Sequence, residues 1–162
     1  MSGNKLGPSG CSDLFSAMGM ETPHPNKRIL LERLTVTNNE AGKAGAEAIR
    51  HVLAGQTKLT HLDLAGNLLG DGGGSAIALC LAAEAPAAAT ATTTATATAM
   101  ASLRFIGLRS NFIGLEGFSA LLEVLESHTH APQLESIDVG GNVRRAPSRP
   151  CGYAAAALHL KI

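Results

Sequence analysis

The feature that most constrains the fold of this chain is an internal repeat of 28 residues. The segment LERLTVTNNEAGKAGAEAIRHVL begins at Leu31 and aligns without gaps with LTHLDLAGNLLGDGGGSAIALCL, which begins at Leu59. The matching positions in the first segment are Leu31, Leu34, Val36, Asn39, Ala41, Gly42, Gly45, Ala48, Ile49 and Leu53. Agreement of apolar, asparagine and glycine positions over this length indicates stacked structural units.

Two further copies follow the first pair. LRFIGLRSNFIGLEGFSALLEVL begins at Leu103, and the shorter LESIDVGGN begins at Leu134. The third copy starts later than the 28-residue step requires, and the surplus equals the low-complexity tract APAAATATTTATATAM, residues 85–100. We therefore expect repeats that start near 31, 59, 103 and 134, within a domain over 27–142 that carries an Ala/Thr insert at 85–100.

Each copy changes period in the middle. In LTHLDL, Leu62 and Leu64 alternate with His61 and Asp63, which is typical of a strand with one buried face. After Asn67 the apolar spacing becomes helical, at Gly73, Ala76, Ile77 and Leu81. One strand and one helix cannot bury their apolar faces alone, so the copies must stack with parallel strands on one side and helices on the other.

The shared pattern LxxLxLxxNxLGxxGxxALxxxL resembles the leucine-rich repeat of the ribonuclease-inhibitor type, over about residues 31–142. The resemblance implies an α/β fold, a short curved leucine-rich-repeat solenoid with parallel strands on its concave side and helices on its convex side. Repeat folds of this kind present an extended surface to other proteins.

The ends of the chain do not show the repeat clearly. Residues 1–26 carry Gly, Pro, Ser and Asn without a sustained apolar period, so we expect a disordered N-terminal lead. After Asn142, VRRAPSRP breaks the pattern, and GYAAAALHL places small and apolar residues at helical spacing up to Leu160. We expect residues 143–162 to form a degenerate C-terminal tail or cap that closes with a helix.

Two polar features repeat with the period and are interpreted as structural. An asparagine follows each strand, and its side-chain amide can satisfy backbone groups of the turn; these residues are Asn39, Asn67, Asn111 and Asn142. The turn GNLLGDGGGS lacks the Lys-Ser/Thr ending of a phosphate-binding loop, and Gly70 and Gly73 recur in the other copies. The remaining Gly72 and Gly74 have no counterparts, and we interpret them as a loosened turn.

Composition disfavours several classes of function. Thirteen basic and thirteen acidic residues balance, which argues against a nucleic-acid partner. Three cysteines without metal-type spacing indicate free thiols in a reducing compartment, and Cys80 is expected to be buried and inert. The start lacks the pattern of a secretory signal, and the uncharged span 85–103 is too weakly apolar for a membrane helix. We expect a cytoplasmic protein without a membrane partner.

Candidate chemistry is sparse. No two of the six histidines stand at helical i, i+4 spacing with a carboxylate partner, which argues against a metal site. No serine or cysteine lies in a recognisable nucleophile motif. The sequence therefore predicts no enzyme, no catalytic residue, no metal, no cofactor and no small-molecule substrate.

The outward positions of the predicted strands form the candidate site. They carry arginine and aromatic side chains among polar neighbours, as the centres of protein interfaces do. The residues predicted to bind a partner protein are Arg33, Thr35, His61, Asp63, Phe105, Arg109 and Asp138. The leading hypothesis is a non-catalytic protein-interaction module. Three alternatives stay open: a regulator of a small GTPase, to which the repeat resemblance alone points, a fragment of a larger receptor or scaffold, and a merely solvated strand face.

Overall fold

The computed structural model describes residues 2–19, 30–53, 58–82, 102–126, 133–142 and 159–161. Its elements, in chain order, are α1 (Gly7–Gly19), β1 (Arg33–Thr35), α2 (Gly42–Leu53), β2 (His61–Asp63), α3 (Gly70–Ala82), β3 (Phe105–Gly107), α4 (Leu115–Glu126), β4 (Ser136–Asp138) and β5 (His159–Lys161). The strands form one sheet in the order β1-β2-β3-β4-β5, in which β1 to β4 are parallel.

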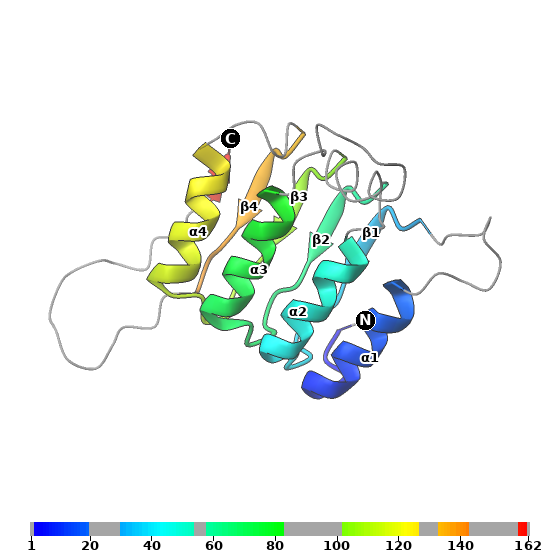
Figure 1. The fold of residues 1–162 in the computed structure, drawn as a ribbon. Helices are drawn as coiled ribbons and strands as arrows, with labels where there is room; N and C mark the ends of the chain where they lie inside the picture. The colour runs from blue at the N-terminus through cyan, green and yellow to red at the C-terminus, as the bar shows by residue number, and fades with distance from the viewer. Residues whose placement is uncertain are drawn as a thin grey trace, which may run out of the picture.

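The helices lie side by side in a row that covers one face of the sheet (Figure 1). Strand order follows chain order, because each helix carries the chain back to the start of the next strand. This mixed α/β architecture, with four parallel strands in the sheet and the helices on one side of it, is compatible with the stacked repeats that the sequence predicts.

The register of the parallel strands places equivalent residues in rows across the sheet. Leu34, Leu62, Ile106 and Ile137 are Cα partners in one such row, and all four are buried under the helices. The helices add their own apolar stripe at positions such as Ile49, Ile77, Leu81 and Leu121. Each fully buried Leu or Ile contributes about 1.5–3 kcal/mol, so the rows account for most of the favourable free energy of stacking.

The asparagine column is structural, as predicted. Asn67 is fully buried, and its Oδ1 accepts a hydrogen bond from the backbone N–H of Asn39 at 3.0 Å, while its Nδ2 donates to the carbonyl of Leu64 at 2.9 Å. The Oδ1 of Asn111 in turn accepts from the N–H of Asn67 at 2.8 Å. Each amide therefore joins its own turn to that of the preceding repeat.

Residues 7–19 differ from the expected disordered lead, because they form helix α1. Cys11 and Phe15 of α1 are 0% and 1% exposed and belong to the hydrophobic core. The turn before α1 also joins the asparagine column, since the N–H of Asn4 donates to Asn39 Oδ1 at 3.1 Å. The first described residues thus make the second half of a further repeat.

The sequence carries a signal for this half-repeat that apolar periodicity misses. NKLGPSG, from Asn4 to Gly10, has the asparagine and glycine spacing of NEAGKAG, which begins at Asn39. Backbone geometry repeats as well, because Lys5 and Glu40 have φ of 50° and 57°, as do Leu68 and Phe112 with 58° and 59°. A left-handed residue at this position is therefore part of every described turn that leads into a helix.

The two unmatched glycines have different roles, and the interpretation as a loosened turn is wrong, because both lie within α3. A Cβ at Gly74 would lie 2.9 Å from Gly117 Cα and 3.0 Å from Ile113 Cγ2, so the absence of a side chain lets α3 approach α4. A Cβ at Gly72 would only meet the Lys43 side chain, at 3.7 Å or more.

The C-terminal residues also differ from expectation. Residues 159–161 form β5, which pairs antiparallel with β4 and places Leu160 opposite Ile137, instead of continuing a helix. An alternating His-Leu-Lys segment suits a strand as well as a helix, and the edge of β4 offers unpaired backbone groups that favour the strand. The predicted insert at 85–100 and the tail over 143–158 lie outside the described residues.

Candidate protein-interaction surface on the strand face

The strand face, the side of the sheet opposite the helices, carries all the residues predicted to bind a partner. Alternation along each strand turns one set of side chains inward and the other outward, and the outward residues of β1 are exposed. The register aligns Arg33, His61, Phe105 and Ser136 in a first row. It aligns Thr35, Asp63, Gly107 and Asp138 in a second row.

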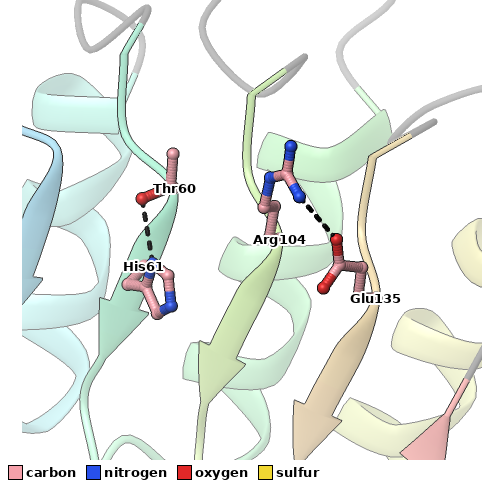
Figure 2. A network of polar contacts seen from close by, with 4 residues as sticks. All are labelled: Thr60, His61, Arg104 and Glu135. Atoms are coloured by element: carbon pink, nitrogen blue, oxygen red, sulfur yellow. Dashed lines mark hydrogen bonds and ion pairs between the residues drawn. The ribbon is translucent and has the colours of Figure 1, made fainter.

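An aromatic pair occupies the centre of the first row. The ring centroids of His61 and Phe105 lie 6.0 Å apart with an interplanar angle of 35°. Beside them the Thr60 hydroxyl lies 2.9 Å from His61 Nδ1 (Figure 2). The same hydroxyl lies 2.9 Å from the carbonyl of Glu32, to which it donates, so the Thr60 side chain links His61 to the backbone of the preceding repeat.

An ion pair that the sequence analysis missed borders the same row. Arg104 Nη1 lies 2.8 Å from Glu135 Oε1, just before β3 and β4 begin (Figure 2). Both side chains are more than half exposed, so the pair adds little to stability. The sequence does place the two partners at equivalent positions of neighbouring repeats. In each copy a polar residue stands one residue before the first outward strand position, and these residues are Glu32, Thr60, Arg104 and Glu135.

The second row has no side chain at Gly107, which stands between two aspartates. Asp63 Oδ1 accepts the N–H of Ala65 at 3.1 Å, and Asp138 Oδ1 accepts the N–H of Gly140 at 3.0 Å. These matching contacts hold the strand exits, as Asp side chains commonly do in turns. Gly107 lies between the two aspartates, and a Cβ there would approach Asp63 Oδ1 to 2.6 Å. Both aspartates therefore have a structural role as well as an outward carboxylate.

Arg109 completes the predicted set two residues beyond the end of β3. It is exposed, and its Nη1 would lie 3.4 Å from a Cβ placed on Gly140 of the adjacent repeat. The absence of a side chain at Gly140 thus makes room for the guanidinium next to Asp138. The structure brings together Asp63 of β2, Phe105 of β3, Asp138 of β4 and Arg109, which follows β3, whereas Arg33 and Thr35 lie on β1.

Large exposed apolar side chains occur away from the strand face. They are Leu30, Leu68, Leu79, Phe112, Leu115 and Leu122. Phe105 itself is half-buried by its neighbours. The aromatic surface of the strand face is therefore modest, and charged and polar groups dominate its chemistry.

The glycine-rich turn at α3 acts as architecture. Asp71, in the first turn of α3, accepts backbone hydrogen bonds through Oδ1 from Gly114 at 2.7 Å and from Gly117 at 2.9 Å. One carboxylate thereby caps the N-terminus of α4 across the repeat boundary, where a negative charge is favourable. It also places a negative charge where an anion would otherwise bind.

The described thiols are free and weakly reactive in character. Burial raises the pKa of the Cys80 thiol to about 11, although the nearby Arg50 guanidinium opposes the shift. Burial also raises the pKa of the Cys11 thiol. Cys80 is partly rather than fully buried, yet its thiol stays protonated at neutral pH, as an inert cysteine requires. Cys151 lies outside the described residues.

Within the described ranges, no group of three His, Cys, Asp or Glu residues is arranged to hold a metal ion. Three of the six histidines, His24, His128 and His130, lie outside those ranges. No helix in the described part of the chain is long and apolar enough to cross a membrane.

Comparison with known families agrees with the repeat. Residues 55–78 match a family model described as Leucine Rich repeat. The matched segment contains β2 and the first part of α3, the strand and helix of one repeat. This match supports a leucine-rich repeat protein, a class that commonly serves protein interaction. No curated protein matches the chain.

Proposed function

We propose that the chain is a non-catalytic protein-interaction module of the ribonuclease-inhibitor-like type, which binds a partner protein through a concave strand face. The observation that carries the proposal is the continuous first row, where a cation and two tilted aromatic rings stand in register on adjacent strands: Arg33, His61 and Phe105. Arginine and aromatic side chains are the residue types enriched at interface centres.

The size of the strand face bounds the affinity. Parallel strands lie about 4.8 Å apart, so the four parallel strands span roughly 14 Å across the sheet. A stable complex usually buries about 800 Å² on each partner, which exceeds what three outward residues on each strand supply. We therefore expect a stable complex to require that the partner also contact the edges of the sheet.

The proposal is tested by affinity capture with two matched triple variants. In the first, Arg33, Phe105 and Arg109 are changed to alanine, and we expect loss of the captured partner. In the control, three exposed helix residues, Lys43, Glu47 and Glu123, are changed to alanine, and we expect the wild-type result. The same captured proteins in all three samples would refute the assignment to the strand face.

A separate assay tests the non-catalytic part of the proposal. The chain is added to a panel of small GTPases loaded with GTP, and the rate of hydrolysis is measured. We expect no change in rate. Acceleration of any member would overturn the assignment as a pure interaction module and favour the GTPase regulator.

A further inference from the structure

A carboxylate and an aromatic ring meet at the centre of the strand face, over Gly107 of β3. Gly107 is buried, and its Cα partner on β2 is Asp63. A Cβ on Gly107 would lie 2.6 Å from Asp63 Oδ1 and 3.3 Å from Phe105 Cε1. Because Gly107 has no side chain, the Asp63 carboxylate and the edge of the Phe105 ring converge on the space above it.

Two arginines near this point already have acidic neighbours. Arg104 forms its ion pair with Glu135 at 2.8 Å (Figure 2). Arg109 lies beside Asp138, because a Cβ on Gly140 would be 3.4 Å from Arg109 Nη1 and 3.2 Å from Asp138 Oδ1. The positive charge of each of these side chains is therefore offset within the strand face.

Asp63 has no such neighbour. Within the described ranges no cation forms an ion pair with it, not even the exposed Arg33 on the adjacent strand. Its Oδ1 accepts the N–H of Ala65, and its Oδ2 makes no hydrogen bond to a described residue. Burial of an unpaired carboxylate is unfavourable, so a partner that covers the strand face must bring a compensating group to Asp63.

The neighbouring ring favours one kind of cation. A guanidinium is planar, stacks on aromatic rings and directs N–H groups toward a carboxylate in its own plane, whereas an ammonium is compact and strongly hydrated. Phe105 is half-buried and its centroid lies 6.0 Å from that of His61, so the ring is packed before a partner binds. The turn hydrogen bond likewise holds the Asp63 carboxylate in place, which lowers the cost of binding.

We propose that an arginine side chain of the partner protein docks over Gly107, where its guanidinium forms an ion pair with Asp63 and stacks on Phe105. This inference rests on the proposed function, because it names the group that the partner presents to the strand face. Asp138 stands on the other side of Gly107, roughly 10 Å from Asp63 between Cα atoms, since two strand spacings separate them. Arg109 offsets the charge of Asp138, so Asp63 supplies most of the attraction.

The test uses three small probes on the isotope-labelled full chain, followed by two-dimensional NMR. They are N-acetyl-arginine amide, N-acetyl-citrulline amide, which has nearly the same shape without the charge, and N-acetyl-lysine amide. The backbone amides of Asp63 and Gly107 report binding. The variant Asp63→Asn removes the charge and keeps an Oδ1 that can accept the N–H of Ala65. The matched control Glu123→Gln removes one charge from the exposed surface of α4.

We expect the arginine probe to shift both amides saturably, with a dissociation constant of about 1–10 mM. The citrulline and lysine probes should bind about fivefold or more weakly, because one lacks the charge and the other lacks the planar group. Asp63→Asn should weaken arginine binding by a similar factor, and Glu123→Gln should leave it unchanged. The proposal is overturned by no saturable shift up to about 50 mM, by a citrulline or lysine probe that binds as well as arginine, or by unchanged binding in Asp63→Asn.

Affinity capture separates this inference from the proposed function. We expect Asp63→Asn to lose the captured partner, as the triple alanine variant of the strand face does. Loss in the triple variant with full capture by Asp63→Asn would overturn the arginine site and leave the strand face as the interface. Full capture by the triple variant would instead refute the proposed function, and the probes would then still decide whether the site over Gly107 accepts an arginine side chain.

Discussion

Gly72 and Gly74 offer a matched test of the packing between repeats. They stand two residues apart in α3, and neither has a positive φ, so alanine is compatible with the backbone at both. A Cβ at Gly72 would make ordinary contact with the Lys43 side chain, at 3.7–3.9 Å. We expect Gly72→Ala to stabilise the fold by about 0.5–1 kcal/mol, because alanine loses less backbone entropy in a helix.

The same change at Gly74 should have the opposite sign. Its Cβ would meet Gly117 Cα at 2.9 Å and Gly117 C at 3.2 Å, and these backbone atoms cannot rotate away. Separating α3 from α4 costs about 1–3 kcal/mol, as overpacking of cores does. The gain in helix propensity returns about 1 kcal/mol, which leaves a net destabilisation of about 1 kcal/mol at the middle of that range and of up to about 2 kcal/mol.

The assay is urea denaturation of both variants and the wild type, followed by far-ultraviolet circular dichroism, with the free energy of unfolding obtained by linear extrapolation. The expected gap between the two variants is about 2 kcal/mol, from the estimates above. If Gly74→Ala were as stable as Gly72→Ala, α3 and α4 could not be in the close contact described here. A change in the slope of the free energy of unfolding against urea concentration would instead indicate that the variant alters the compactness of the native or denatured state.

The remaining predictions concern polar contacts and thiols. Asn67→Ala leaves buried backbone groups without partners and should lower the free energy of unfolding by about 3 kcal/mol or more, measured by the same urea assay, with the exposed Glu123→Ala as a control. Asp71→Ala removes the cap of α4 and should cost about 1 kcal/mol, whereas no loss would mean that water replaces the carboxylate. The pKa of Cys80 rises on folding from 9.0 to about 11, so the folded state holds its proton more tightly. Its contribution to stability is complete below pH 9 and is lost as the pH rises toward 11, so the urea midpoint should fall over that interval in the wild type and fall less in Cys80→Ala.

Much of the fold follows from periodicity in the sequence. Alternation in LTHLDL and helical spacing after Asn67 predict β2 and α3, and the same patterns predict the other described repeats. The asparagine column could be assigned a structural role for the same reason, since a residue that recurs at each turn serves each turn. Helix α1 was missed because residues 1–26 show no sustained apolar period, and the spacing of Asn4, Gly7 and Gly10 was the remaining signal.

The sequence predicted which residues lie on the strand face, but it did not predict the contacts that their side chains make. Outward positions follow from alternation, so the residues on the strand face could be named in advance. The contact of the Thr60 hydroxyl with His61 Nδ1 and the ion pair between Arg104 and Glu135 depend on side-chain rotamers. Pattern alone cannot supply such contacts, because it gives the face on which a side chain lies and not its rotamer.

The sequence by itself determined which side chains face the helices and in what order the strands stack, because the apolar period is a local property that each repeat carries. Only the tertiary structure decided which contacts neighbouring repeats make with each other. The cap that Asp71 gives α4 and the approach of Gly74 to Gly117 both depend on distances across repeat boundaries. Those distances are fixed by the packing of whole helices against one another, and no single repeat contains them.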